Sequence, residues 1–352
     1  MYNWFPSSLL LLTSCSLLWL CGCKAEPAGA GGGPATLLGI DSLLAATSVR
    51  PFSGVVLVKA GGKTIHFSGA GLDADKKPTT FTPETSFVIG SISKQVTATL
   101  VLREYQRGNI DLDWRIGAYL PRLSPGWKDT VTVRQLLNHT HGIINREHPL
   151  AFAPGTNFSY SNLGYQLLAE ILEATTDQPY PELVNDLFAS LGMLHSTAIE
   201  PEATNLATGF SRSAAGVLTI DTTALTGSYL PAAYLISSAG DLARWNKALH
   251  QGGILDSLAY QQMIIPSAQQ HHSLFGEVGY GYGLRISDLD DLVEIGHTGY
   301  VNGFVSLNLY YPELKTSLIV LENLDWRAAD IGETFAFEMG VREVFRGCLG
   351  RE

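Results

Sequence analysis

Strand-like patterns lie near both ends of this 352-residue chain, and helical patterns fill the part between them. Residues 52–71 read as two strands around Gly61 and Gly62, a glycine pair typical of a hairpin turn. Apolar runs toward the C-terminus predict further strands over 279–286, 292–300, 303–311 and 316–323, with a turn at Pro312. The chain is therefore predicted to form one sheet built from both ends, with a helical insertion at roughly 106–230.

Helical spacing of apolar residues recurs along the rest of the chain. It predicts helices over 37–49, 133–143, 163–176, 235–253 and 328–340. With 45% apolar and 16% charged residues, the composition is that of a globular protein. The formal net charge is −10 and no basic stripe is present, so we expect no nucleic-acid partner.

The N-terminal residues indicate export. The first 22 residues contain no charged side chain, and an apolar run over 8–21 has signal-peptide length. The run ends in Leu-Cys-Gly-Cys, which resembles a bacterial lipobox, so we expect a signal peptide at 1–22 and lipidation of Cys23. A Gly-rich tether would follow over 23–35, with the folded domain at 36–352. An ordinary signal peptide cleaved after Ala30 is the alternative.

On the lipoprotein reading, the protein is expected at the cell envelope. Residue 24 is lysine and not the aspartate that is linked to inner-membrane retention. In a host with two membranes the expected place is the periplasmic face of the outer membrane. The expected partners are then the membrane, through the lipid anchor, and a small-molecule or peptide substrate.

The stretch FVIGSISKQVTATL, residues 87–100, opens like a buried strand and continues like a helix. If a helix begins at Ser91, then Ser91 and Lys94 share a face, whereas Ser93 points elsewhere. Burial would lower the pKa of Lys94, and a neutral amine beside a hydroxyl is a general base beside a nucleophile. The helix N-terminus would also stabilise an oxyanion. The structural alternative is a capping serine and a lysine that extends to solvent.

Two further motifs add polar groups. Tyr160 and Asn162 precede a predicted helix, on an extended approach where residues two apart face the same way. A phenol and an amide on one side can relay a proton and bind a substrate amide. His297, Thr298 and Gly299 lie on a predicted strand, and the glycine would let a substrate backbone approach the strand edge. The structural alternatives are a buried tyrosine, an N-cap asparagine and a surface histidine.

Ser-x-x-Lys, Tyr-x-Asn and His-Thr-Gly, in this order, resemble the motifs of the serine β-lactamases and penicillin-binding DD-peptidases. The resemblance points to the class C-like branch, with its DD-carboxypeptidases, D-aminopeptidases and family VIII esterases. It covers nearly the whole chain from about Leu37, and segments 136–143 and 235–245 resemble framework segments of that family. It implies an α+β fold with a mainly antiparallel sheet, helices on both faces, a helical subdomain and no cofactor.

The resemblance also implies a role for each matching residue. Ser91 would be the acylated nucleophile, with its N–H as half of an oxyanion hole. Lys94 and Tyr160 would share the proton transfers, and Asn162 would orient the substrate and Lys94. The remaining wall of the site would be formed by His297, Thr298 and Gly299, with the N–H of Tyr300 as the second half of the oxyanion hole.

This chain departs from the family pattern at two places. His297 stands where β-lactamases of this branch usually carry lysine, which favours a peptidase or esterase over a β-lactamase. His141 stands where the family usually has serine. His139 and His141 could suggest a metal pair, but no acidic or cysteine ligand is adjacent, so no metal site is predicted.

The sequence thus predicts a cell-envelope serine hydrolase that forms an acyl-enzyme on Ser91 and acts on D-amino peptides or short esters. A class C-like β-lactamase and a non-catalytic penicillin-recognising sensor or scaffold remain alternatives. An α/β-hydrolase is disfavoured, because no serine has glycine at both positions of a Gly-x-Ser-x-Gly elbow. No two carboxylates can be paired for glycosidase chemistry.

Overall fold

The computed structural model describes residues 37–46, 51–124, 126–198, 205–213, 215–221, 227–326 and 331–350. They belong to one compact unit, Gly32–Glu352. The predicted signal peptide, Cys23 and the tether lie outside the described residues. Within the described ranges, no helix has the length and hydropathy needed to span a membrane.

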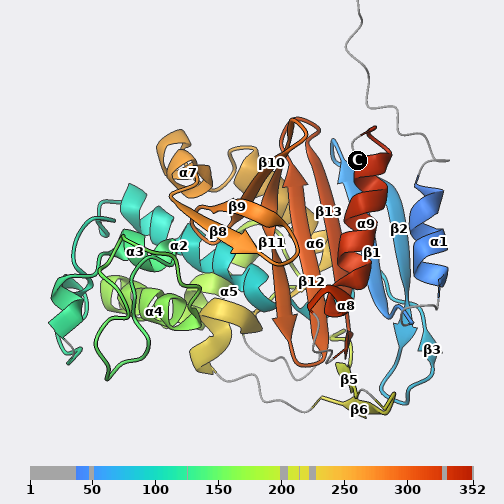
Figure 1. Ribbon diagram of the computed structural model, residues 1–352, viewed down its shortest axis with the longest axis horizontal. Helices are drawn as coiled ribbons and strands as arrows, with labels where there is room; N and C mark the ends of the chain where they lie inside the picture. The colour runs from blue at the N-terminus through green and yellow to red at the C-terminus, as the bar shows by residue number, and fades with distance from the viewer. Residues whose placement is uncertain are drawn as a thin grey trace, which may run out of the picture. The chain divides into compact units, whose positions relative to one another are not determined.

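A nine-stranded antiparallel sheet forms the centre of this unit (Figure 1). Val56 lies opposite Val320, so the first long strand pairs with one from the C-terminal part, and the prediction of a sheet built from both ends is confirmed. In spatial order the strands are β3 (Pro78–Thr79), β2 (Lys63–Leu72), β1 (Gly54–Ala60), β13 (Thr316–Glu322), β12 (Phe304–Tyr311), β11 (Leu292–Val301), β10 (Arg285–Leu289), β9 (Gly276–Tyr280) and β8 (Ala268–His272).

Alternating side chains of the central strands pack into two separate cores. On β1, Val55 and Leu57 join the larger core, whereas Val56 and Val58 join a smaller core on the other face. Successive strand residues point to opposite faces, so an apolar run buries both sides of the sheet. Helices α1 (Leu38–Ala45) and α9 (Ala336–Gly347) cover the smaller core, and α6 (Ala239–His250) packs on the opposite face (Figure 1). The α+β fold with helices on both faces is therefore confirmed.

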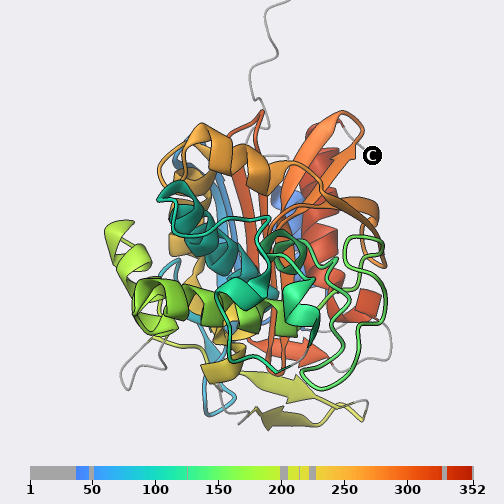
Figure 2. The ribbon, with the colours of Figure 1, turned by 90° about the vertical axis from the view of Figure 1, so that its left-hand side faces the viewer.

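Most of the remaining helices, from residues 93–190 and 257–264, gather beside the sheet, and Figure 2 shows them in front of it. The buried apolar side chains of α2, α4 and α5 belong to the larger core. Region 106–230 also contains two short strands that pair with each other, and one of them also pairs with a third strand from near the C-terminus. The elements not yet given are α2 (Ser93–Gln106), α3 (Val133–Leu137), α4 (Asn162–Thr176), α5 (Tyr180–Ser190), α7 (Ser257–Ile264), α8 (Ile331–Thr334), β4 (Ser86–Val88), β5 (Phe210–Arg212), β6 (Leu218–Ile220), β7 (Ile236–Ser238) and β14 (Leu324–Trp326).

Four predicted elements differ from the structure. The helix predicted over 133–143 ends at Leu137, because His139 has a φ of +61°, which lies outside the α-helical region. The strand predicted over 279–286 is the end of β9, a connection and the start of β10. The connection contains Gly283, whose φ is +70° and whose added Cβ would lie 2.6 Å from the Lys94 carbonyl oxygen, so only glycine fits there. The helix predicted over 235–253 begins at Ala239, because residues 236–238 pair with β4 as β7. The C-terminal helix is divided into α8 and α9 and extends to Gly347.

Candidate active site

Ser91 lies in η1, a 3₁₀ turn over Gly90–Ile92 that joins β4 to α2. The α-helix was predicted to begin at Ser91, and it begins two residues later, at Ser93. The strand-then-helix reading of residues 87–100 holds, because the preceding Phe87 and Val88 are buried in β4. Ser91 is half-buried and remains at the N-terminal end of the helical segment.

The η1 turn lies directly against β11. A Cβ on Gly90 would be 2.5 Å from the Tyr300 backbone nitrogen, and a Cβ on Gly299 would be 2.2 Å from the Ile89 carbonyl oxygen. Ser306 Oγ also donates a hydrogen bond to that carbonyl over 2.9 Å. The sequence suggested that Gly299 makes room for a substrate. The structure gives a different reason, since the close approach is to the chain's own backbone beside Ser91.

Lys94 is completely buried, with no exposed surface. Its Nζ atom lies 3.0 Å from Ser91 Oγ, 2.8 Å from Asn162 Oδ1 and 2.8 Å from the Ala232 carbonyl oxygen. Ala232 belongs to η5, a π-helical turn over Leu230–Tyr234 that sequence reasoning did not connect with the site. We call Ser91, Lys94, Tyr160 and Asn162 the Ser91 cluster.

The contacts of Lys94 suit an uncharged amine. Burial lowers the pKa of Lys94 well below its usual range, and the positive charge of Arg285 lowers it further. A neutral amine has two N–H donors and one lone pair. The carbonyl oxygens of Asn162 and Ala232 accept the two donors, which leaves the lone pair for the Ser91 hydroxyl. This arrangement can take a proton from Ser91.

Tyr160 and Asn162 approach Lys94 from the N-terminal end of α4. Ser161 between them caps that helix, with its Oγ accepting from the Gly164 N–H over 3.3 Å. The Tyr160 ring centroid is 4.7 Å from Lys94 Nζ. Burial raises the pKa of the Tyr160 hydroxyl, while Arg285 and a hydrogen bond with Ser91 oppose that shift. Because Tyr160 remains 38% exposed, solvent moderates the effect of burial.

His297 is buried on β11 and is not a surface histidine. Its Nε2 lies 3.1 Å from the Tyr280 hydroxyl, and its Nδ1 lies 2.5 Å from the Thr298 carbonyl oxygen. Burial lowers the pKa of His297 well below its usual range, and the nearby positive charges of Arg285 and Lys94 act in the same direction. His297 is therefore a neutral side chain at ordinary pH.

Arg285, at the start of β10, is a site residue that sequence reasoning missed. Its guanidinium donates to Thr298 Oγ1 over 3.0 Å and lies 5.9 Å from the Tyr160 ring centroid. No carboxylate among the described residues forms a salt bridge with it. A guanidinium therefore lies beside His297, although no lysine stands at that position of the motif. No local pattern in the sequence marks Arg285, because it reaches the site through the pairing of β10 with β11, where it lies opposite Gly296, next to His297.

The two histidines considered as a metal pair are hydrogen-bonded within the chain. His139 Nδ1 accepts from the Ser161 N–H over 3.2 Å, and His141 Nδ1 accepts from the Ile143 N–H over 2.8 Å. In the part of the chain that the structure describes, no group of three or more potential ligands is placed to hold a metal ion.

The antiparallel sheet with helices on both faces, and the serine–lysine pair beside it, define a protein of the β-lactamase/transpeptidase fold. The chain belongs to the Beta-lactamase family, whose model matches residues 45–336. The family resemblance inferred from the three motifs is confirmed. A putative penicillin-binding protein is similar in sequence, and a penicillin-binding protein homologue from Pyrococcus abyssi and a D-amino acid amidase share the fold.

Two curated bacterial proteins illustrate the similarity in sequence. Protein flp of Staphylococcus aureus (strain NCTC 8325 / PS 47) is 27% identical over 310 residues, which cover 78% of this chain and 60% of that protein. Putative penicillin-binding protein PbpX of Bacillus subtilis (strain 168) is 24% identical over 294 residues, with 78% and 71% covered. The chain thus spans about 60% of the length of the flp proteins that it matches.

Solved structures show the same fold at lower identity. D-amino acid amidase from Ochrobactrum anthropi SV3, complexed with D-phenylalanine, matches with a TM-score of 0.77 and 23% identity over 89% of this chain and 99% of that one. D-stereospecific amidohydrolase from Streptomyces sp. matches with a TM-score of 0.67 and 24% identity, with 86% and 96% covered.

Proposed function

We propose that this protein is a cell-envelope serine hydrolase that forms an acyl-enzyme on Ser91 and acts on D-amino peptides or short esters. The observation that carries this proposal is the contact set of Lys94 Nζ, which lies 3.0 Å from Ser91 Oγ and 2.8 Å from each of two carbonyl oxygens. A buried amine held in this way is a general base beside a nucleophile.

The reaction proceeds in two steps. Ser91 Oγ attacks the substrate carbonyl carbon while Lys94 takes the hydroxyl proton. The proton passes through Lys94 and Tyr160 to the departing amine or alcohol, whose bond to the carbonyl carbon breaks. Water then attacks the acyl carbon, gives up a proton to the same groups and releases the acid with Ser91 restored. The N–H groups of Ser91 and Tyr300 would bind the oxyanion of each tetrahedral intermediate.

Arg285 favours substrates that carry a carboxylate. A guanidinium held by Thr298 Oγ1 at the edge of β11 offers charge-assisted hydrogen bonds to a terminal carboxylate. Strand β10 pairs with β11 only as far as Gly296, so residues 297–301 pair with β12 alone among the described strands. An extended peptide can lie along this edge. These features support a D-amino peptide with a free C-terminus as the preferred substrate.

The test is intact-mass analysis after parallel incubation with a fluorophosphonate, a labelled penicillin and p-nitrophenyl esters. The proposal expects one added acyl or phosphonyl mass on Ser91, followed by turnover of a D-amino peptide. Absence of any covalent adduct with all three probes would contradict acyl-enzyme chemistry. A stable penicillin adduct without turnover of any substrate would favour a sensor. Fast penicillin turnover would favour a β-lactamase.

The cellular location follows from the N-terminal residues alone. The Leu20–Cys23 motif and the Gly-rich tether support a lipid anchor on Cys23 that holds the domain at the cell envelope. The test is fractionation of cells that produce the Cys23→Ser protein. The anchored protein should move to the soluble fraction, and unchanged membrane association would contradict lipidation.

A further inference from the structure

We propose that Tyr280 is a positioning residue that helps to stabilise one tautomer of His297 and links the N-terminal end of α4 to β11 by hydrogen bonds. The predicted effect on kcat/KM rests on the proposed function, whereas the hydrogen bonds of Tyr280 and the His297 tautomer can be tested without a substrate. Tyr280 ends β9 and is completely buried, and the acyl-transfer steps above give it no role.

The short contact at His297 decides where its proton lies. Nδ1 is 2.5 Å from the Thr298 carbonyl oxygen, and two acceptors at this distance would repel each other. Nδ1 must therefore carry the hydrogen, which leaves Nε2 of the neutral ring as an acceptor. The group that faces Nε2 is the Tyr280 hydroxyl at 3.1 Å, so Tyr280 donates to His297.

The contacts of His139, the other histidine that faces Tyr280, also show which of its ring nitrogens carries the hydrogen. His139 Nδ1 accepts from the Ser161 N–H, so the hydrogen of this neutral ring lies on Nε2. Nε2 is 3.2 Å from the Tyr280 hydroxyl oxygen and donates to it. The hydroxyl therefore accepts from one buried histidine and donates to the other, and the four hydrogen bonds from Ser161 to Thr298 run in one direction.

This chain of hydrogen bonds joins the N-terminal end of α4 to β11, on two sides of the candidate active site. Ser161 lies between Tyr160 and Asn162 of the Ser91 cluster, and Thr298 lies on β11 beside Arg285. Tyr280 hydrogen-bonds to both histidines, whose rings also both lie against the ring of Tyr160. The Tyr280 hydroxyl thus connects the segment that carries Tyr160 and Asn162 to β11, the strand that would bind substrate.

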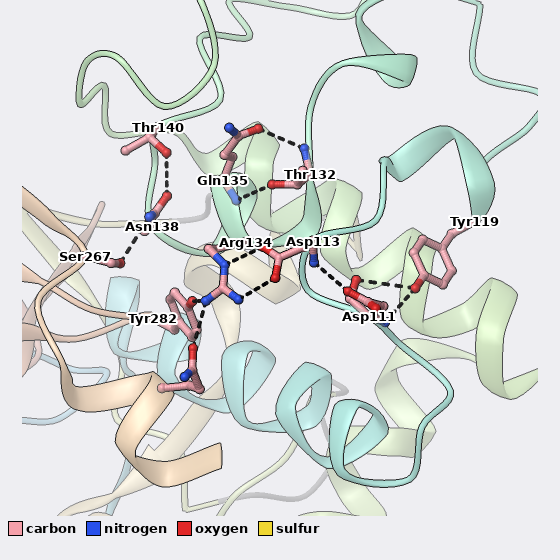
Figure 3. Close-up of polar contacts among 11 residues, drawn as sticks. Asp111, Asp113, Tyr119, Thr132, Arg134, Gln135, Asn138, Thr140, Ser267 and Tyr282 are labelled. Atoms are coloured by element: carbon pink, nitrogen blue, oxygen red, sulfur yellow. Dashed lines mark hydrogen bonds and ion pairs between the residues drawn. The ribbon is translucent and has the colours of Figure 1, made fainter. Parts of the chain in front are cut away.

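Separate contacts connect the segments that carry His139 and Tyr280, and Figure 3 shows those made by Arg134 and Asn138. Arg134 binds both carboxylate oxygens of Asp113, at 2.8 and 2.9 Å, and donates to the hydroxyl of Tyr282. The Asn138 side chain contacts Ser267 Oγ at 3.1 Å. These bonds do not involve the Tyr280 hydroxyl, so a Tyr280→Phe protein should keep its fold.

The His297 tautomer determines which acceptors the Arg285 guanidinium can donate to. One guanidinium nitrogen lies 3.1 Å from His297 Nδ1 and 3.0 Å from Thr298 Oγ1. With a hydrogen on Nδ1, the guanidinium cannot donate to the ring and is directed to Thr298 and the substrate side. In the other tautomer Nδ1 would accept from Arg285 and compete with a substrate carboxylate. The Thr298 carbonyl oxygen and Tyr280 act on opposite nitrogens of the ring and favour the same tautomer, and Tyr280 thereby contributes to keeping Arg285 available for the carboxylate.

The first experiment reads the tautomer without any substrate. Proton–nitrogen correlation spectra of histidine-labelled protein, with the His297 signals identified through His297→Gln, should show a protonated Nδ1 and a bare Nε2 near neutral pH. In Tyr280→Phe this pattern should change, because Nε2 loses its donor. A protonated Nε2 in the unaltered protein, or an unchanged His297 pattern in Tyr280→Phe, would overturn the proposal.

The second experiment measures preference between a D-amino peptide with a free C-terminus and its C-terminal amide. Tyr280→Phe should lower the kcat/KM ratio of acid to amide about tenfold, the size expected for one lost buried hydrogen bond. The control is Tyr311→Phe, which removes a buried hydroxyl that contacts Glu294 Oε1 at 3.2 Å in the other core. An equal change in both variants, or none in Tyr280→Phe, would contradict the positioning role. If neither substrate reacts, the proposed function fails, and the spectra still decide the tautomer.

Discussion

The side-chain amine of Lys94 lies 3.0 Å from the hydroxyl of Ser91, and the other two atoms that contact it are carbonyl oxygens. Carbonyl oxygens only accept hydrogen bonds, so they orient the two N–H groups of a neutral amine and direct its lone pair at the serine. The pair is thus set for proton transfer before any substrate arrives. Four predictions follow from this relationship and from the groups around it, one for each of Ser91, Lys94, Arg285 and His141.

Ser91→Ala should abolish covalent labelling by a fluorophosphonate, measured by intact mass, because the acylated oxygen is absent. Ser93→Ala is the matched control. Ser93 Oγ donates to the Gly90 carbonyl over 2.7 Å and accepts from the Leu235 N–H over 3.2 Å. Its loss should lower the free energy of unfolding by about 1–3 kcal/mol and leave labelling intact. Labelling that persists in Ser91→Ala would show that another residue is the nucleophile.

The labelling rate with an uncharged probe should rise with pH and level off well below pH 10.5, the reference pKa for lysine, since only neutral Lys94 accepts the Ser91 proton. Lys94→Arg should react at least about 100-fold more slowly at every pH, because a guanidinium stays protonated. Lys247→Arg, an exposed change on α6, should behave like the unaltered protein. A Lys94→Arg protein of normal reactivity would remove Lys94 from the proposed mechanism.

Arg285→Gln should shift preference away from substrates with a free carboxylate. A charge-assisted hydrogen bond contributes about 1.5–3 kcal/mol, so the kcat/KM ratio of a D-amino peptide to its amide should fall roughly 10- to 100-fold. Lys247→Gln, which removes an exposed cation, should leave the ratio unchanged. His297→Lys is the weaker test, because a lysine there would lie beside the Arg285 cation and deprive the Tyr280 hydroxyl of its acceptor. An unaltered ratio in Arg285→Gln would argue against carboxylate binding.

The protein should lose stability as the pH falls below about 6.5, the value for an unperturbed histidine. Burial lowers the pKa of His141 to about 4, so the unfolded chain binds its proton first. This residue contributes stability above pH 6.5 that is lost as the pH falls toward 4, up to about 3 kcal/mol. Urea unfolding of His141→Gln should show a shallower loss over this interval.

The control for that measurement is His271→Gln, because the side chain of His271 is 76% exposed. Its unfolding free energy should follow the pH dependence of the unaltered protein. Parallel slopes for His141→Gln and the unaltered protein would mean that protonation of His141 is not coupled to folding.

Much of the fold was predictable because its signals are local. A strand alternates faces at every residue, so the apolar run of β1 predicts burial on both sides. A helical turn brings residues three apart onto one face, so the Ser91–Lys94 spacing predicts their contact, and the 3₁₀ turn that replaces the first α-helical turn preserves it. The order of the three motifs then predicts the family.

By itself, the sequence determined which segments become strands and helices, and which serine and lysine share a turn. Only the tertiary structure decided the remaining contacts of that pair. Lys94 meets Ala232 across 138 residues of sequence, and Arg285 approaches the site because β10 pairs with β11. Gly299 is required by the backbone of Ile89, and Tyr280 joins His139 to His297. Such contacts depend on strand register and on the packing of helices against the sheet, which cannot be inferred from the spacing of apolar residues along the sequence.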